Sequence, residues 1–230
     1  IEKLMKPKRR NFFDHQNMGI IEYDDALRLQ RDLHKKRCDG NIRDTILSLQ
    51  HPNIITIGKN ADDSGILVQK MRLEELGVKV YKTDRGGQLT YHGPGQLILY
   101  FIVNIRKLNY GPVDFVRKIE EVIISFLAEY EISAHRVSKE IGVWIGGKEG
   151  QNFNKNLKKI SALGLRISNG VSMHGVALNI TPNLDLYNLI IPCGIKNMQS
   201  TSFLLEGKTD ISMNNIVEKL LNIIEEKIYK

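Results

Sequence analysis

The segment QLILYFIVNI, residues 96–105, limits the fold more than any other part of the chain. It has the length of a β-strand and is almost continuously apolar, whereas a strand with one solvent-facing side would alternate polar and apolar residues. We therefore expect a central strand that is buried on both faces, with a layer of structure on each side. The chain contains no run of about eighteen apolar residues, so the sequence predicts no membrane span.

Helical and strand patterns are grouped along the rest of the chain and do not strictly alternate. Apolar residues recur at helical spacing in residues 21–37, 71–76, 112–130 and 214–229. Strand patterns occupy residues 44–50, 53–59, 78–84, 141–147, 159–167 and 171–180. The first two strands are joined by His51, Pro52 and Asn53, so we expect them to form a hairpin. The grouping favours an α+β fold with a mixed sheet over a doubly wound α/β fold.

The chain has 230 residues, a length that suits one large domain. We expect this domain to occupy residues 20–230, after a basic N-terminal arm over residues 1–19. Residues 148–158 are polar and rich in Asn and Lys, which predicts a loop inserted between two strands. Cys38 and Cys193 lie far apart and match no metal-binding spacing, so we expect no disulfide scaffold, no metal site and a reducing compartment.

The net charge of +7 and the isoelectric point near 9.3 predict attraction to an acidic partner. Nucleic acid, an anionic membrane surface and acidic proteins are all partners of this kind, and charge alone does not choose between them. Nucleic acid is disfavoured because aromatic residues make up only 7% of the chain, so surfaces for stacking bases are scarce.

The most distinctive motif is RGGQLTYHGPGQ, residues 85–96. Its glycines lack a Cβ atom, so a ligand can approach the main chain closely. The motif follows a strand pattern but no helix begins after it, which excludes a Walker A loop and a dinucleotide-binding loop. A glycine-rich turn between two core strands is the structural alternative. The placement of Arg85 and His92 around the glycines favours a ligand pocket.

Two further side chains stand in surroundings that are unusual for them. Cys193, in the turn sequence PCG, is either a nucleophile or, as most cysteines are, an inert buried side chain. Lys159 begins the apolar, glycine-bearing strand KISALGLR, although burying an ammonium costs free energy. The structural alternative is that Lys159 only ends the polar loop, as Lys158 does. His174, in SMHGVAL, is interpreted as a core histidine.

The chain resembles the lipoyl(octanoyl) transferase family from about Tyr23 to the C-terminal helix. The segments RGGQLTYHGPGQL, KISALGLR, HGVALN and PCG occur in the family's order, and HPNIITIGK and GVWIGGK also match. The resemblance implies the fold of biotin and lipoate protein ligases, a mixed sheet with helices packed on it. It also implies an enzyme that begins protein lipoylation by moving an octanoyl group from acyl carrier protein to a lysine of a lipoyl domain. In this family a cysteine holds the acyl group as a thioester.

The resemblance assigns roles to individual residues of this chain. Cys193 is the expected nucleophile, Lys159 is its expected catalytic partner, and no cofactor is implied. The positions that match the acyl-binding segments of the family are Arg85, Gly86, Gly87, Gln88, Leu89, Thr90, Tyr91, His92, Ala162, Leu163, Gly164, Gly175, Val176 and Ala177.

Two alternative functions stay open. An ATP-dependent lipoate or biotin protein ligase has the same fold, but the PCG turn and the lack of a GRGRxGR-like loop argue against it. A basic nucleic-acid-binding module is suggested only by the charge. The expected partners are octanoyl-acyl carrier protein as donor and lipoyl domains of 2-oxoacid dehydrogenase complexes or the glycine cleavage H protein as acceptors, with no nucleic acid and no membrane. The compartment stays open between a plastid-type organelle, a mitochondrion and a bacterial cytoplasm.

Overall fold

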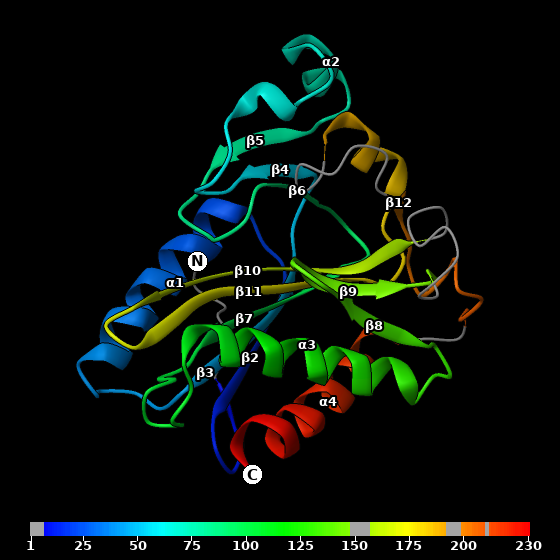
Figure 1. The fold of residues 1–230 in the computed structure, drawn as a ribbon. Coiled ribbons are helices and arrows are strands. Elements are labelled where there is room, and N and C mark those ends of the chain that lie inside the picture. Colours follow the sequence, from blue (N-terminus) through cyan, green and yellow to red (C-terminus); the bar gives the residue numbers. More distant parts are fainter. Residues whose placement is uncertain (1–6, 148–156, 192–198, 210–211) are drawn as a thin grey trace.

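The computed structural model describes residues 7–147, 157–191, 199–209 and 212–230 (Figure 1). A mixed sheet, here called sheet A, forms its centre, with the order β1-β2-β3-β7-β11-β10-β9-β8 and with β12 beside β10. These strands span Lys8–Arg9 (β1), Asp14–Ile20 (β2), Thr45–Gln50 (β3), Gln96–Ile102 (β7), Val171–Asn179 (β11), Lys158–Ser168 (β10), Glu140–Ile145 (β9), Ala134–Val137 (β8) and Gln199–Ser200 (β12).

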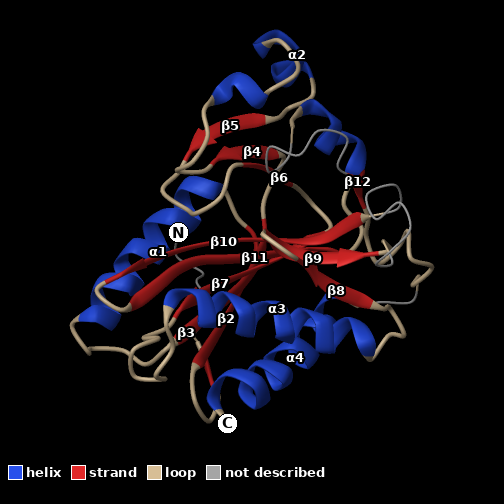
Figure 2. Ribbon diagram, viewed as in Figure 1, coloured by secondary structure: helices blue, strands red, loops and turns tan. Residues whose placement is uncertain are grey.

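A second, small sheet has the order β5-β4-β6. Its strands are Lys79–Lys82 (β5), Ile54–Ile57 (β4) and Leu89–His92 (β6). The helices are α1 (Tyr23–Cys38), α2 (Lys70–Glu75), α3 (Pro112–Ala128) and α4 (Met213–Ile224), and α4 continues into a π-helical turn over Glu225–Tyr229. Helices α3 and α4 cover one face of sheet A, whereas α1 and the small sheet lie on its other side (Figures 1 and 2). The expected mixed sheet with helices packed on it is confirmed.

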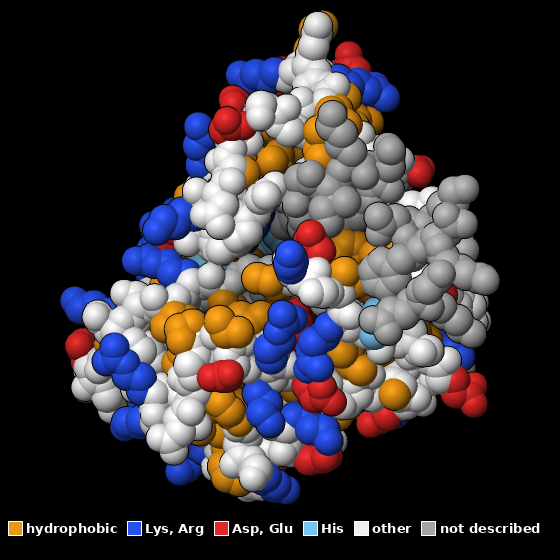
Figure 3. All heavy atoms as spheres, in the orientation of Figure 1, with side chains coloured by type: hydrophobic (Ala, Val, Ile, Leu, Met, Phe, Trp, Pro, Cys, Tyr) orange, Lys and Arg blue, Asp and Glu red, His pale blue; other side chains and the backbone are white. Residues whose placement is uncertain are grey.

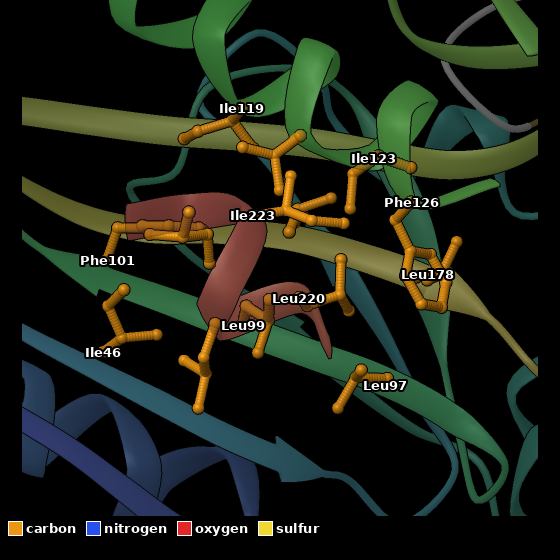
Figure 4. Packing of buried hydrophobic residues seen from close by; sticks show 14 of the residues in the cluster. Ile46, Leu97, Leu99, Phe101, Ile119, Ile123, Phe126, Leu178, Leu220 and Ile223 are labelled. Carbon is orange, nitrogen blue, oxygen red and sulfur yellow. The ribbon is translucent and has the colours of Figure 1, made fainter. Parts of the chain in front are cut away.

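The main hydrophobic core lies between sheet A and the helix pair α3 and α4 (Figure 4). Apolar residues at helical spacing on both helices meet the face of β7 that carries Leu97, Leu99 and Phe101. Each buried side chain of this size stabilises the fold by about 1.5–3 kcal/mol relative to an exposed one. Ile98 and Tyr100, on the other face of β7, are buried as well. The predicted burial of this strand on both faces is therefore confirmed.

The predicted hairpin between the first two strands is wrong, because β3 belongs to sheet A and β4 to the small sheet. The turn between them carries the chain from one sheet to the other. His51 fixes this corner: its Nδ1 lies 2.7 Å from the carbonyl oxygen of Ile21, and its Nε2 lies 2.8 Å from the hydroxyl of Tyr100. Such long-range partners leave no local signal in the sequence.

The segment expected to be a basic arm joins sheet A from Lys8 onward through β1 and β2. Phe13 is fully buried in the main core. The basic side chains of Lys8 and Arg10 form ion pairs with Glu218 at 3.1 and 3.0 Å, and Arg10 also pairs with Glu225 at 2.8 Å. This segment therefore packs against the C-terminal helix, since its positive charges meet carboxylates there.

Besides β1 and β2, three short strands had no clear pattern in the sequence, namely β6, β8 and β12. β6 lies inside the glycine-rich motif, and β8 pairs with the outer edge of β9. The inserted loop predicted for residues 148–158 ends where β10 begins at Lys158, and residues 148–156 lie outside the described part of the chain. Across the described residues, no helix is both long and apolar enough to cross a membrane.

Candidate functional site

Five parts of the chain line one cavity between sheet A and β6. The space between the lining atoms is about 490 Å³, including the open mouth. All the expected acyl-binding residues line it except Gly86 and Tyr91. Sequence reasoning missed four other lining residues, Tyr23, Ile98, Tyr100 and His174. We call this space the acyl cavity, after the acyl-binding role that the resemblance implies for these residues.

The strand pair β10 and β11 forms one wall of the acyl cavity. The strands are antiparallel, with Ala162 opposite Ala177 and Gly164 opposite Gly175. A Cβ atom added to Gly164 would lie 2.7 Å from the carbonyl oxygen of Gly86, so the glycine-rich motif packs directly on the strand. The N–H group of Gly86 donates to the carbonyl oxygen of Leu165 at 3.0 Å. Because the glycine-rich motif packs so closely on β10, the cavity between them is narrow. Gly86 attaches the motif to β10 and does not line the cavity.

Arg85 holds the glycine-rich motif in place. Its buried guanidinium donates from Nε to Thr56 Oγ1 at 3.0 Å and from Nη2 to the Thr56 carbonyl oxygen at 2.7 Å. It also reaches the carbonyl oxygens of Gly86 at 3.0 Å and Gln88 at 2.5 Å. The planar guanidinium supplies several donors in a fixed geometry, so one side chain orders the whole turn.

His92 is buried at the edge of the acyl cavity. Its Nδ1 lies 2.7 Å from Gln96 Oε1, which accepts, because the amide nitrogen of Gln96 donates to Asn179 Oδ1 and to the hydroxyl of Tyr187, both at 2.9 Å. Burial, and next the neighbouring His51, lower the pKa of His92 to about 3. His92 is therefore a neutral imidazole at pH 7 whose Nε2 can only accept a hydrogen bond.

Tyr91 lies on the opposite side of β6 from the cavity. Its hydroxyl donates to Asn53 Oδ1 at 2.8 Å, and its ring meets that of Tyr187 edge-on at 5.3 Å. The alternation of side chains along a strand explains why Tyr91 belongs to the core of the small sheet while Thr90 and His92 line the cavity.

Lys159 is buried, with 4% of its surface exposed, and lies on β10 opposite Trp144 of β9. Its Nζ atom is 4.4 Å from the centroid of the indole ring. Gly142 leaves room for the side chain: a Cβ atom there would lie 2.8 Å from Lys159 Cε. Lys158 differs clearly, because it is half-buried and forms an ion pair with Glu206 at 3.6 Å. Lys159 is therefore not part of the loop surface.

Sequence reasoning missed Gly142 and Trp144 as neighbours of Lys159. Both lie in the segment GVWIGGK, which holds the only tryptophan of the chain. The positive φ of Gly142, 132°, suits glycine alone. Its N–H group donates to the fully buried carboxylate of Glu120 at 3.0 Å, which ties this strand to α3.

Cys193, the expected nucleophile, lies outside the described residues. On one side of it, the N–H group of Ile191 donates to the carbonyl oxygen of Gly65 at 2.8 Å. On the other side, β12 runs parallel to the start of β10, with Ser200 opposite Lys159. The Thr201 N–H group donates to the Lys159 carbonyl oxygen at 3.0 Å.

His174 is more than the core histidine that its sequence context predicts. It is buried and lines the acyl cavity. Its backbone φ of 59° is uncommon for a residue other than glycine. Its Nε2 lies 2.8 Å from Asp84 Oδ1, and Asp84 also forms an ion pair with Arg166. Burial lowers the pKa of His174, and the hydrogen bond from His174 holds the pKa of Asp84 well below its usual range.

The comparison with known proteins gives one family and one fold. Residues 22–225 match the family described as the lipoyl protein ligase A/B catalytic domain. An octanoyltransferase of Alkaliphilus metalliredigens is 44% identical over 187 residues, which cover 81% of each chain. A mitochondrial octanoyltransferase of Arabidopsis thaliana is 37% identical over 205 residues, which cover 89% of this chain and 83% of that one.

Solved structures of low sequence identity have the same fold. A bipartite lipoate protein ligase from Thermoplasma acidophilum superposes with a TM-score of 0.64 at 13% identity, covering 87% of this chain and 79% of that one. The P. falciparum protein LipL1 in complex with lipoate superposes with a TM-score of 0.65 at 18% identity, covering 91% of this chain and 62% of that one. At these identities the likeness concerns the fold alone.

Proposed function

The chain belongs to the lipoyl protein ligase A/B catalytic domain family and is an octanoyltransferase within it, and we propose that it works through a thioester on Cys193. The donor is octanoyl-acyl carrier protein, and the acceptor is a lysine of a lipoyl domain. The observation that carries the proposal is that the motif segments line one narrow cavity along β10, the strand that bears the buried Lys159.

The first half-reaction transfers the acyl group to Cys193. Its thiolate attacks the carbonyl carbon of the donor thioester, a new C–S bond forms, and the carrier leaves as a thiolate that takes up a proton. A thiol with an ordinary pKa near 8.5 is only a few per cent ionised at pH 7. An ammonium about 4 Å away would stabilise the thiolate by at most roughly 4 kcal/mol at an effective dielectric constant of 20. Lys159 supplies this ammonium.

The second half-reaction transfers the acyl group to the acceptor. The ε-amine of the incoming lysine attacks the thioester carbon, an amide forms, and Cys193 leaves as a thiolate. The attacking amine must lose a proton, and Lys159 accepts it after giving up its own to the departing carrier. His92 cannot supply a proton, because it is neutral; it closes the cavity wall and orients the acyl group.

The positive charge of the chain suits this pair of substrates. Acidic partner surfaces are steered toward a basic protein, which speeds their encounter. Over the face shown in Figure 3, Lys and Arg side chains are spread among acidic ones. The charge therefore favours acidic carrier and lipoyl domains in general, among them the lipoyl domains of 2-oxoacid dehydrogenase complexes and the glycine cleavage H protein.

A transfer assay without nucleotide tests the proposal against the ligase alternative. The protein is incubated with octanoyl-acyl carrier protein and an unmodified lipoyl domain in the absence of ATP. The intact mass of the lipoyl domain is expected to rise by one octanoyl group. A requirement for ATP and free octanoate would instead show a ligase, and the proposed mechanism would be wrong.

A further inference from the structure

Tyr23, the first residue of α1, separates the acyl cavity from a second hollow. Among the described residues, it is the one that lines both. The second hollow, here called the outer groove, lies between the start of α1 and the small sheet and has a volume of about 1780 Å³, including open solvent. Its apolar lining includes Ile54, Ile57, Leu73, Val78, Val80 and Tyr81.

The ring of Tyr23 is held between the two spaces. It is stacked on His92, which lines the acyl cavity, with ring centroids 6.5 Å apart and an interplanar angle of 12°. Its centroid also lies 5.1 Å from that of Tyr81, which lines the outer groove. The hydroxyl donates to Thr83 Oγ1 at 2.9 Å, and only 3% of the residue is exposed. The ring of Tyr23 is thus held in place at the border of both spaces, and we refer to it as the wall between them.

This wall stands at the end of the acyl cavity that is remote from Lys159. Gly164 lies about 16 Å further along β10 than Lys159, at roughly 3.3 Å per residue. Gly164 pairs with Gly175, and Gly175 pairs with Tyr100 of β7. The hydroxyl of Tyr100 contacts His51, whose ring centroid lies 5.2 Å from that of Tyr23. A chain whose reacting carbon lies near Lys159 therefore points its tail toward Tyr23.

We propose that the ring of Tyr23 is the stop that limits the length of the bound acyl chain. The inference rests on the proposed function, which places an acyl chain in this cavity. With the ring in place, the polar groups around it offer no apolar continuation for a longer tail. Without the ring, the cavity opens into the outer groove, where apolar side chains can bury additional methylene groups.

The test compares the binding of octanoate and dodecanoate by calorimetry, with no catalytic step involved. In Tyr23→Ala, the affinity for dodecanoate relative to octanoate is expected to rise by about tenfold or more, since each added methylene contributes when it is buried. Tyr23→Leu, which keeps an apolar side chain in the helix, should shift the ratio in the same direction, and thermal unfolding verifies that both variants are folded.

Two matched variants are controls for the ring of Tyr23. Tyr23→Phe keeps the ring and loses the bond to Thr83, and Tyr81→Ala enlarges the outer groove without opening the wall. Both should keep the wild-type ratio within about twofold. The proposal that Tyr23 limits chain length would be wrong if the ratio of dodecanoate to octanoate affinity is unchanged in folded Tyr23→Ala and Tyr23→Leu. An equal rise of this ratio in Tyr81→Ala would also contradict it.

Transfer assays separate this inference from the proposed function. If the wild-type protein transfers octanoyl groups while the Tyr23 variants keep its preference for octanoyl over dodecanoyl donors, the stop is wrong and the proposed function stands. In the opposite case, the variants shift fatty-acid binding, but neither they nor the wild-type protein take an acyl group from acyl carrier protein. The role of Tyr23 in limiting chain length is then correct, and the proposed function is wrong.

Discussion

The Nζ atom of Lys159 lies 4.4 Å from the centroid of the Trp144 ring on the neighbouring strand β9. A cation over the face of an indole is stabilised by about 2 kcal/mol or more when both groups are desolvated. The contact offsets part of the cost of burying an ammonium and limits where its charge can lie. A fixed positive charge at the start of the strand that lines the acyl cavity is what a thiolate nucleophile needs.

Removing this charge should change the titration of Cys193. Lys159→Met keeps the length of the side chain, so we expect the pKa of the Cys193 thiol to rise toward about 8.5. The pH dependence of iodoacetamide alkylation at Cys193 measures it. Lys158→Met is the matched control, because Lys158 is half-buried and paired with Glu206, and it should leave the profile unchanged. Equal profiles for the two variants would remove Lys159 from the mechanism.

Gly142→Ala should damage the site through Lys159. The new methyl group would meet Lys159 Cε at 2.8 Å, and a φ of 132° is strained for alanine, which together should cost about 1–3 kcal/mol and most of the transfer activity. Gly40→Ala is the control, since Gly40 also has a positive φ, of 78°, but open space around it. Urea unfolding and octanoyl transfer measure both effects. Full activity in Gly142→Ala would show that the position of Lys159 is not critical.

Stability should fall in mildly acidic solution because buried histidines are neutral in the folded protein. Burial lowers the pKa of His51 to about 4 and that of His92 to about 3, against about 6.5 in the unfolded chain. The unfolded chain therefore binds more protons than the folded protein as the pH falls. The stability that these histidines contribute is fully present above pH 6.5 and is lost progressively below it. His51 alone should account for on the order of 2 kcal/mol between pH 7.5 and pH 5.

Urea unfolding at these two pH values checks the histidine prediction. His51→Gln should be less stable than the wild-type protein at pH 7.5, since it loses the contacts to Ile21 and Tyr100, but it should show a smaller loss on acidification. A wild-type stability that does not change between pH 7.5 and pH 5 would contradict the prediction.

Arg85→Lys should loosen the glycine-rich motif while keeping its charge. A lysine cannot reproduce the separate bonds to Thr56, Gly86 and Gln88, so we expect KM for the acyl donor to rise by about tenfold. Arg166→Lys, which changes an exposed ion pair with Asp84, should alter KM by less than about twofold. Steady-state kinetics of both variants measure the difference. An unaffected KM in Arg85→Lys would mean that the motif is ordered by other contacts.

Local patterns in the sequence predicted much of the fold. Continuous apolarity located β7, and helical spacing located α1 and α3. The separation of β3 and β4 into two sheets could not be predicted, because a His-Pro-Asn turn looks alike whether it closes a hairpin or joins two sheets. The corner depends on the contact of His51 with Tyr100, which is distant in sequence.

For the candidate site too, local sequence patterns indicated some residues, whereas others depend on contacts between distant parts of the chain. Residues within the motifs, such as Ala162 and Val176, line this cavity, and their acyl-binding role stays a prediction. Tyr23 and Tyr100 come from a helix and a core strand whose patterns indicate packing alone. His174 gave a weak signal, since a histidine before glycine on an apolar strand fits both a core position and a cavity wall. Only the three-dimensional arrangement joins these residues to the motifs.

The central claim is that Cys193 carries the acyl group, and the most direct measurement is the intact mass of the protein after incubation with octanoyl-acyl carrier protein. The wild-type protein and Cys38→Ser should each gain one octanoyl group that hydroxylamine removes, whereas Cys193→Ser should gain none. An octanoyl group on Cys38, or a full adduct in Cys193→Ser, would contradict the account.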